Sequence, residues 1–577
     1  MLFQEVSDSF EKTKKTTSRL EITSILAGLF KKTKTADIKR LCYLLQGVVQ
    51  PSFAGIEIGM GEKLAERSVS LTTGQTQKEV EEDYKKTGDL SKTTRNAMQK
   101  RKQSSLTKDD LTLEKVFDNL YKISTTSGSG SVEMKIKLLS ELLSNARPEE
   151  AEIIMKIITG KISSGFAEQT IISALNESRE GSKESQEELE RAYYLTSDLG
   201  DVAEVLFNKG FEEIKKVKPV PFKPIMPALA ERLANAEEII KKLGECVADY
   251  KYDGFRLQVH LKNNEIQIFS RRQERMTHMF PDLIEAVKKQ VKAKEIIFEG
   301  EAISFDEKNQ TFLPFQVTIT RKRKHEVEKR SKAIPLRLYA FDLLYLDGED
   351  YTKKKYVERR KKLEETIKEG DKIHLSTQKM VKTAEELDRY FNEALKKGLE
   401  GVIAKDLNAP YTVGARKFAW IKLKKSYESK IADTIDATIV GYYYGKGKRT
   451  KLGVGGLLTA VYDNKNEKFK TIAKLGTGFS EEQLEWFSKN LKPLKEKPEN
   501  VESILKANVW VEPLIVVTIK ADEITKSTIH TCAFKEEQGL ALRFPRLTQI
   551  RNDKKPSDST TEKEVIEMFR MQSEKQA

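Results

Sequence analysis

A lysine flanked by two aspartates is the group in this chain best placed to do chemistry. In the stretch ADYKYDGFRLQVH, residues 248–260, Asp249, Lys251 and Asp253 alternate with tyrosines, so an extended strand would set the three charged side chains on one face. A lysine amine is a poor nucleophile at its ordinary pKa of about 10.4, and nearby cations or burial must lower that pKa before it can attack. The stretch therefore indicates either a nucleophilic lysine or a solvated hairpin with ordinary charges.

A turn and a second strand follow the lysine. Asp253-Gly254 is a typical turn dipeptide, and apolar residues then alternate at Leu257, Val259 and Leu261. We therefore expect a β-hairpin whose turn leaves the amine within reach of a small ligand.

Later strands carry the other residue types that such a site would need. Glu299 and Glu301 alternate onto one face of EIIFEGEAISF, and Lys422 and Lys424 onto one face of FAWIKLKK, while Phe341 lies within the buried strand LRLYAFDLLYLDG. The candidate site then consists of Lys251, Asp253, Arg256, Arg271, Glu301, Phe341, Glu400, Arg416, Lys422 and Lys424.

Together these residues supply what transfer of a nucleotide to a lysine requires. Cations can neutralise phosphates, an aromatic face can stack on a base, and carboxylates can hold a divalent metal. Acidic residues without a cysteine and histidine set favour Mg²⁺, with Mn²⁺ as an alternative, over zinc.

The composition is that of a basic protein with several domains. At 577 residues the chain exceeds one hydrophobic core. A net charge of +14 with 33% charged residues indicates a polyanionic partner or, alternatively, a lysine-rich surface of the thermophile kind. Three scattered cysteines form neither a disulfide framework nor a zinc pattern. Without a signal peptide or a long apolar run, we expect a cytoplasmic protein that does not bind membranes.

Three domains are predicted. Residues 1–220 show helical spacing, for example at Ile38, Leu41, Cys42 and Leu45, and their scattered lysines and arginines favour a grip on a duplex backbone over mere packing on a neighbouring domain. Residues 221–425 mix strands and helices after a proline-rich linker. Short strands broken by turns make residues 426–577 mostly β and favour a small β-barrel such as an OB-fold, followed by a terminal helix.

The order of the motifs resembles that of the ATP-dependent DNA ligases, especially the archaeal and eukaryotic replicative kind. KYDGFR looks like the family's nucleotidyl-lysine motif, and FSRR, FEGEA, YAFDLLYLDG, EGVIAK, WIKLK and GLALRFPRLTQIRNDK look like the motifs that follow it. The helical region also resembles the family's DNA-binding domain. The resemblance implies a helical DNA-binding domain, an α+β nucleotidyltransferase (ATP-grasp-like adenylation) domain and a C-terminal OB-fold.

The reaction that this resemblance implies has three steps. Lys251 attacks the α-phosphate of ATP and releases pyrophosphate, AMP passes to the 5′-phosphate at a nick in duplex DNA, and the 3′-hydroxyl displaces AMP. By the same resemblance the nucleotide contacts are Asp249, Arg256, Arg271, Glu301, Phe341, Arg416, Lys422 and Lys424. Glu301 and Glu400 would bind metal, and Arg543, Arg546 and Asp553 would close over the triphosphate, swung by a hinge at 425–430.

Departures from the family pattern affect single contacts. Asp249 stands where the family usually has glutamate, and KISSG at 161–165 replaces a lysine-rich turn that contacts the DNA backbone. QSSL near residue 103 is weakly similar to a sliding-clamp peptide, although it lacks the aromatic pair. We expect a monomer whose partner is nicked duplex DNA, with a sliding clamp as a further candidate.

Two other functions are compatible with part of these features. An RNA ligase or a capping guanylyltransferase would share K-x-D-G, but would not need the long helical region. A non-catalytic DNA-binding protein would not need both acids and lysines in one pocket. An NAD-dependent ligase is disfavoured because no four-cysteine zinc site appears.

Overall fold

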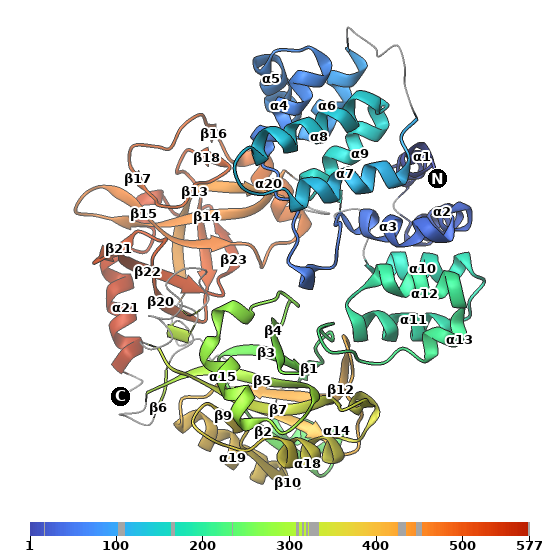
Figure 1. Cartoon of the computed structure of the whole chain (residues 1–577). Helices are drawn as coiled ribbons and strands as arrows, with labels where there is room; N and C mark the ends of the chain where they lie inside the picture. Colours follow the sequence, from blue (N-terminus) through green and yellow to red (C-terminus); the bar gives the residue numbers. More distant parts are fainter. Residues whose placement is uncertain are drawn as a thin grey trace. The chain divides into compact units, whose positions relative to one another are not determined.

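The computed structural model describes residues 1–16, 18–101, 110–162, 168–233, 235–306, 311–313, 317–318, 321, 334–424, 434–445 and 453–574. It divides into two compact units, Met1–Lys424 and Lys425–Ala577, which are treated separately below (Figure 1). The predicted hinge at 425–430, the clamp-like QSSL and residues 163–165 of KISSG lie outside the described residues.

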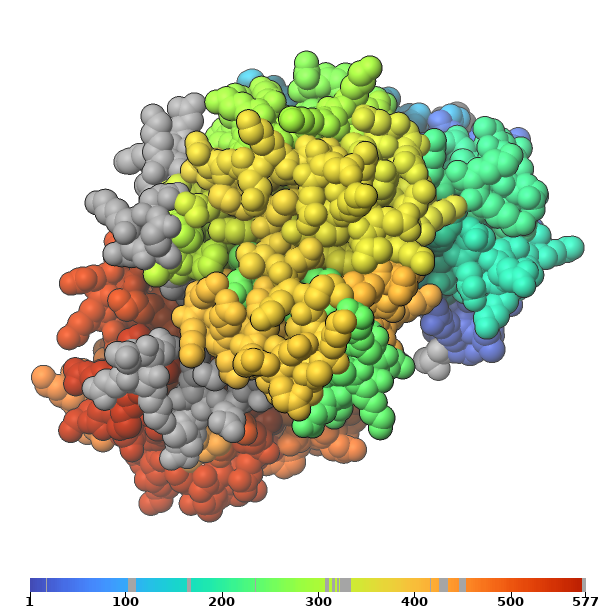
Figure 2. Space-filling model, turned by 90° about the horizontal axis from the view of Figure 1, so that it is seen from below, coloured from blue at the N-terminus to red at the C-terminus, as the bar shows by residue number. Residues whose placement is uncertain are grey.

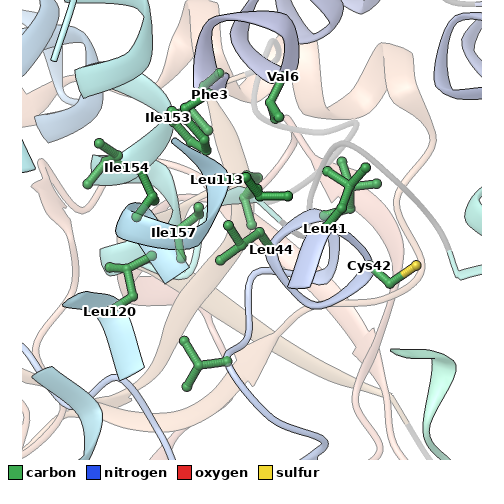
Figure 3. Packing of buried hydrophobic residues seen from close by; sticks show 14 of the residues in the cluster. Phe3, Val6, Leu41, Cys42, Leu44, Leu113, Leu120, Ile153, Ile154 and Ile157 are labelled. Carbon is green, nitrogen blue, oxygen red and sulfur yellow. The ribbon is translucent and has the colours of Figure 1, made fainter. Parts of the chain in front are cut away.

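The first part of the larger unit is helical, as predicted. Buried side chains from α1, α3, α7 and α9 meet in its core, and Figure 3 shows Phe3, Leu41, Leu120 and Ile154 among them. The helices are α1 (Phe3–Thr13), α2 (Arg19–Lys32), α3 (Thr35–Gln46), α4 (Glu62–Thr73), α5 (Gln77–Thr87), α6 (Leu90–Gln99), α7 (Leu113–Thr125), α8 (Ser131–Asn145), α9 (Pro148–Ile158), α10 (Glu168–Ser178), α11 (Lys183–Thr196), α12 (Leu199–Lys209) and α13 (Phe211–Lys215).

Local signals in the sequence mark helix ends well. The serine- and glycine-rich run 124–131 joins α7 to α8, and Gly160, with φ of +66°, follows α9. In α8 the apolar residues Ile136, Leu139 and Leu143 are buried, whereas Val132, in the first turn, is 45% exposed. The Thr383 hydroxyl accepts a hydrogen bond from Glu386 N at the start of α19 (Ala384–Lys396).

A five-stranded sheet carries the lysine. Its order is β1 (Leu229–Arg232), β12 (Arg416–Lys424), β11 (Gly401–Asp406), β2 (Cys246–Lys251) and β10 (Gln378–Val381). Helices α14 (Ala236–Leu243) and α19 cover one face of this sheet, where Tyr250, Tyr252 and apolar side chains form a core. Because side chains alternate along β2, the burial of Tyr250 turns Asp249 and Lys251 toward the opposite face.

A seven-stranded sheet carries the acidic motif. Its order is β4 (Glu265–Ser270), β3 (Phe255–Lys262), β5 (Glu295–Asp306), β7 (Leu336–Leu346) and β8 (Glu349–Asp350), with β6 (Thr311–Phe312) on β5 and β9 (Ile373–Leu375) on β7. Helices α15 (Pro281–Gln290) and α18 (Tyr356–Thr366) pack against it. The surface running from α18 to α19 is the yellow area of Figure 2, which is seen from below.

The predicted hairpin around Gly254 is wrong. β2 pairs with β10 and β11, whereas β3 pairs with β4 and β5, so the two strands belong to different sheets. Each strand buries its apolar face against a different helical layer, and the chain crosses between the sheets at residues 252–254. A Cβ on Gly254 would lie 2.3 Å from the carbonyl oxygen of Ala302, so the crossing needs glycine for close approach.

The smaller unit is mostly β. The predicted strands are present as β13 (Ile435–Tyr444), β14 (Val454–Asp463) and β15 (Lys468–Leu475). They lie in an eight-stranded sheet with β16 (Pro493–Leu494), β17 (Val501–Glu502), β18 (Val509–Val511), β19 (Val516–Lys520) and β23 (Arg546–Arg551). A three-stranded sheet contains β20 (Glu523–Ser527), β21 (Cys532–Lys535) and β22 (Gln538–Arg543), and the helices are α20 (Glu481–Asn490) and α21 (Glu562–Glu574).

None of the helices that the structure describes has the length and apolar character needed to cross a lipid bilayer.

A fully buried ion pair joins β7 to α18. Arg359 donates from Nε and Nη2 to the two oxygens of Asp342 at 2.7 and 2.9 Å, and from Nη1 to the carbonyl oxygens of Lys354 and Ala409. Neither side chain is exposed. The charges are compensated because every strong donor and acceptor of the pair has a partner.

Replacing Arg359 by alanine should lower the free energy of unfolding by about 3–5 kcal/mol, because Asp342 would stay buried without its cation. Urea denaturation followed by the fluorescence of Trp420, with Trp486 and Trp510 changed to phenylalanine, would measure it. The control Arg389→Ala removes an exposed arginine and should change stability by less than about 0.5 kcal/mol. Equal losses of unfolding free energy in the two variants would contradict a stabilising role for the buried Asp342–Arg359 pair.

Candidate active site

Strand pairing brings Lys251 beside Glu400 and Lys424. Gly401 of β11 lies opposite Lys251 on one side and opposite Lys424 on the other. The backbone N–H of Glu400 donates to the Lys251 carbonyl oxygen at 3.1 Å. The Glu400 carboxylate forms an ion pair with Lys251 Nζ. The next row repeats this pattern with Asp249, Ile403 and Lys422.

The Lys251 amine has the lowered pKa that the sequence analysis required. Burial is the main cause, and the positive charges of Lys424 and Lys422 act in the same direction, whereas Glu301 and Asp253 oppose it. A lower pKa increases the fraction of neutral amine, which is the nucleophilic form.

On the facing sheet, Arg256 is held in one orientation. It donates from Nη2 and Nε to Glu299 at 2.8 and 3.2 Å and from Nη1 to the carbonyl oxygen of Ala228 at 2.8 Å. The Tyr411 hydroxyl donates to Glu299 at 2.6 Å and accepts from the N–H of Ala228. The strand pattern of the sequence places Glu299 on the correct face, but the predicted site did not include Glu299 or Tyr411.

A β-bulge sets the position of Phe341. Glu299 pairs with Asp342 and Gly300 with Ala340, so Phe341 is the extra residue on β7. Bulges redirect the side chain of the extra residue. Here the ring is half-buried, edge-on to Trp420 at 6.0 Å between centroids. An exposed part of an aromatic ring on such a wall can stack on a base.

A half-buried carboxylate with an unusual pKa lies next to the lysine. Glu301 pairs with Arg256 across β3 and β5, and burial raises its pKa to about 7 against the opposing effect of Lys251 and Arg256. Asp253, in the crossing segment, raises the pKa further. Glu301 and Glu400 thus place two carboxylates near one amine, a donor set that suits a hard divalent cation.

In the described part of the chain, this site included, no group of three or more histidine, cysteine, aspartate or glutamate side chains converges on one point. Mg²⁺ is commonly held by one or two carboxylates together with water and substrate phosphates, so two glutamates fit that ion.

Asp249 is part of a buried network that sequence analysis did not find. Its Oδ2 accepts from Lys405 Nζ at 2.6 Å and from the Ser376 hydroxyl at 3.1 Å, and Arg360 in turn donates to the Ser376 hydroxyl at 2.9 Å. Burial lowers the pKa of Lys405, whose Nζ also donates to the Phe341 carbonyl oxygen. Side chains alternate along the strand EGVIAK, so Lys405 lies on the same face as Ile403, which pairs with Asp249. That alternation is the signal that could have identified Lys405.

Two predicted nucleotide contacts lie at the edges of the site. Arg271 is exposed in the turn after β4. Arg416 is the first residue of β12, where its backbone pairs with Leu229. The structure does not describe the Arg416 side chain.

The C-terminal residues belong to the smaller unit. Arg543 donates to Glu523 at 2.6 Å, and Arg546 pairs with Asp522. Asp553 instead accepts from Arg551 at 2.7 Å. The two arginines thus have neighbouring acidic partners at the start of β20, and Asp553 pairs separately.

Family models match most of the chain. The model described as ATP dependent DNA ligase domain matches residues 227–424. The model described as DNA ligase N terminus matches residues 2–176, and the one described as ATP dependent DNA ligase C terminal region matches residues 450–554.

Full-length relatives show the same relationship. A probable DNA ligase of Dictyoglomus turgidum is 46% identical over 99% of this chain and 98% of its own. A DNA ligase of Nitrosopumilus maritimus is 39% identical over the same shares of the two chains. Among solved structures, Pmar-Lig_PreS3 is 16% identical, covers 94% of this chain and 99% of its own, and has a TM-score of 0.52, which shows a shared fold.

The network around Asp249 makes a prediction for a double-mutant cycle. Lys405→Met should lower the free energy of unfolding by about 3–5 kcal/mol, because it leaves the Asp249 carboxylate buried without a cation. Asp249→Asn in the same chain should restore at least about 1 kcal/mol of that loss, since no unpaired charge then remains. Urea denaturation of the four proteins measures the cycle, and additive losses would contradict the pairing.

Proposed function

Since the chain belongs to the ATP-dependent DNA ligase family and seals nicks in DNA through an enzyme adenylate, we propose that Lys251 is the residue that carries AMP. The observation that supports this assignment is the partly buried amine of Lys251, which lies at a strand end beside Glu400 and has a pKa below its ordinary value.

In the first step, neutral Lys251 Nζ attacks the α-phosphorus of ATP. A nitrogen–phosphorus bond forms, the bond to the oxygen bridging the α- and β-phosphates breaks, and pyrophosphate leaves with the electron pair. Lys422 and Lys424, in the strand next to β11, are positioned to neutralise the phosphate charge. Arg256, Arg271 and Arg416 are proposed as further contacts with the nucleotide.

Adenine recognition is proposed for Asp249 and Phe341. Among the described residues, the buried Oδ1 of Asp249 has no hydrogen-bond partner, although Oδ2 has two. The exocyclic amine of adenine would supply the missing donor, whereas guanine presents an acceptor oxygen at that position. Asp249 can therefore serve in place of the glutamate usual in the family.

Glu301 and Glu400 would hold Mg²⁺, or Mn²⁺ in its place. The bound ion would supply charge stabilisation at the phosphates. If Glu400 held the ion, it would give up its ion pair with Lys251, and the amine would then be free to lose its proton.

The later steps use the same pocket. The phosphoramidate nitrogen is the leaving group when the 5′-phosphate of the nick takes AMP, and the 3′-hydroxyl then forms the new phosphodiester and releases AMP. The helical region would hold the duplex through phosphate contacts. Arg543, Arg546 and Asp553 would act in the first step, where pyrophosphate leaves.

Domain-level assignments complete the proposal. We place the boundaries near residues 220 and 425 and assign an OB-fold to the smaller unit, where β13 pairs in turn with β14, β18 and β19. An ATP-grasp-like core, the monomeric state, the cytoplasmic location and a sliding clamp as partner stay predictions.

Lysine adenylation tests the central assignment. Incubation with α-labelled ATP and Mg²⁺ should label the protein, GTP should not, and Lys251→Ala should reduce labelling by at least about 1,000-fold, because the nucleophile is missing. Lys262→Ala, a change on β3 away from the site, is the matched control and should label normally. Label retained on the Lys251 variant would refute the assignment.

The rate of self-adenylation should rise with pH. Glu301, with a pKa of about 7, must be ionised to bind metal, and Lys251 must be neutral to attack, so both titrations favour higher pH. Single-turnover labelling should therefore show a transition from Glu301 with its midpoint near pH 7, and the titration of Lys251 adds to the rise. Higher Mg²⁺ should move this midpoint to lower pH because the ion competes with the proton for Glu301. A midpoint independent of Mg²⁺ would exclude Glu301 as its origin.

Arg546→Ala should separate the first step from the last. Self-adenylation should fall by on the order of 10–100-fold, because a cation that stabilises departing pyrophosphate is lost. Sealing of a nick that already carries 5′-AMP should change by less than about threefold, since no pyrophosphate leaves in that step. Lys489→Ala, an exposed lysine on α20, serves as control. Equal losses in both assays would show that Arg546 acts throughout the cycle.

A further inference from the structure

The linker between the helical region and the nucleotide domain is hydrogen-bonded to one polar face of β3. Prolines occupy positions 219, 221, 224 and 227, so the N–H donors of this segment come from the residues between them. Phe222 and Ile225, which lie between prolines, and Ala228, which follows the last one, contact the network that ends at Arg256.

The first contact determines the tautomer of His260. The backbone N–H of Phe222 donates to His260 Nδ1 at 2.9 Å, so Nδ1 has no proton. Nε2 therefore carries the proton and donates it to Gln258 Oε1, 2.9 Å away. Burial lowers the pKa of His260 to about 3, which keeps the ring neutral in any ordinary assay. Phe222 has a φ of +73°, a backbone conformation that this hydrogen bond helps to hold.

Gln258 connects the linker to the ion pair of the pocket. Its Oε1 accepts from the N–H of Ile225 at 2.7 Å, and its Nε2 donates to the Ile225 carbonyl oxygen at 3.0 Å. The same Nε2 lies 3.5 Å from Glu299 Oε1, the oxygen that also accepts from Arg256 Nε. The buried carboxamide thus uses both lone pairs and both protons.

Ala228, three residues after Ile225, is the second point at which the linker contacts the Glu299–Arg256 pair. Ala228 donates its N–H to Tyr411, whose hydroxyl donates to Glu299, and the Ala228 carbonyl oxygen accepts from Arg256. Undocking the linker would therefore remove one acceptor of Arg256 and the linker partners of Gln258 and Tyr411, the two groups that donate to Glu299.

We propose that Gln258 and His260 are positioning residues that couple the seating of the linker to the Glu299–Arg256 pair, so that a seated linker and a bound adenine nucleotide favour each other. This inference rests on the proposed contact between Arg256 and the nucleotide. Coupling of this kind is reciprocal, so the nucleotide stabilises the seated linker to the degree that the linker increases nucleotide affinity.

A KM and kcat measurement on the full chain tests the coupling. Gln258→Leu removes both ends of the carboxamide link, and it should raise the KM for ATP in multiple-turnover nick joining by about 5- to 50-fold while kcat stays within about twofold. A purely structural role would lower kcat with the folded fraction and leave KM unchanged. Gln267→Leu is the matched control, because Gln267 lies opposite His260 on β4 and its side chain bonds Glu265 at the surface.

Hydrogen exchange provides the second readout. In the wild type, the amides of Phe222, Ile225 and Ala228 should exchange more slowly after adenylation by ATP than after removal of AMP with pyrophosphate. This difference should vanish in Gln258→Leu. Should that variant not fold, Tyr411→Phe keeps the ring, removes the hydroxyl between Ala228 and Glu299, and should show the same rise in KM.

The outcomes separate the coupling from the proposed function. Unchanged KM, an equal effect of Gln267→Leu, or linker amides that exchange alike in both wild-type forms would each overturn the coupling while wild-type labelling at Lys251 persists. A wild type that takes no label from ATP would overturn the proposed function itself.

Discussion

Charge compensation in the layer between the two sheets is the constraint on which the rest of the larger unit depends. Asp342–Arg359 and Asp249–Lys405 are fully buried ion pairs, and Glu299–Arg256 joins a buried carboxylate to a partly buried guanidinium. All three pairs have further hydrogen bonds. Removing one partner from such a pair strands a charge, whereas a complete pair costs little. The strands, the bulge and the linker are therefore held in the arrangement that keeps every charge paired.

Lys251 differs from these pairs in one respect. Its partner Glu400 precedes β11 and is 19% exposed, so solvent, a metal ion or a phosphate can reach that carboxylate. The fixed pairs act as a frame, and the exchangeable pair is at the position where covalent chemistry is proposed. A ligand that takes Glu400 changes the charge around the amine without unpairing anything deeper in the layer.

Sequence patterns predicted the parts that depend on neighbours along the chain. The alternation of apolar and polar residues predicted β2, β3 and β5, and it placed Glu299 and Glu301 on one face of β5. Sheet membership depends on long-range packing, and the turn dipeptide at Asp253-Gly254 predicted a hairpin where the chain instead crosses between sheets. The bulge at Phe341 also left no local signal, since it arises from the pairing of β7 with β5. Lys405 was overlooked because a lysine in a strand is ordinarily a surface residue, and only its partner Asp249 shows otherwise.

The crossing at residues 252–254 has a mechanical consequence. Lys251 is the last residue of β2 and Arg256 is the second residue of β3, so the four residues between them link both walls of the pocket. Strands that face each other only through side chains can slide by a residue, but a covalent tether this short does not allow such slippage. The distance between the amine and a ligand bound to the opposite wall is thus limited by the covalent chain and not only by packing. This limit holds during any motion that leaves the two strand ends intact.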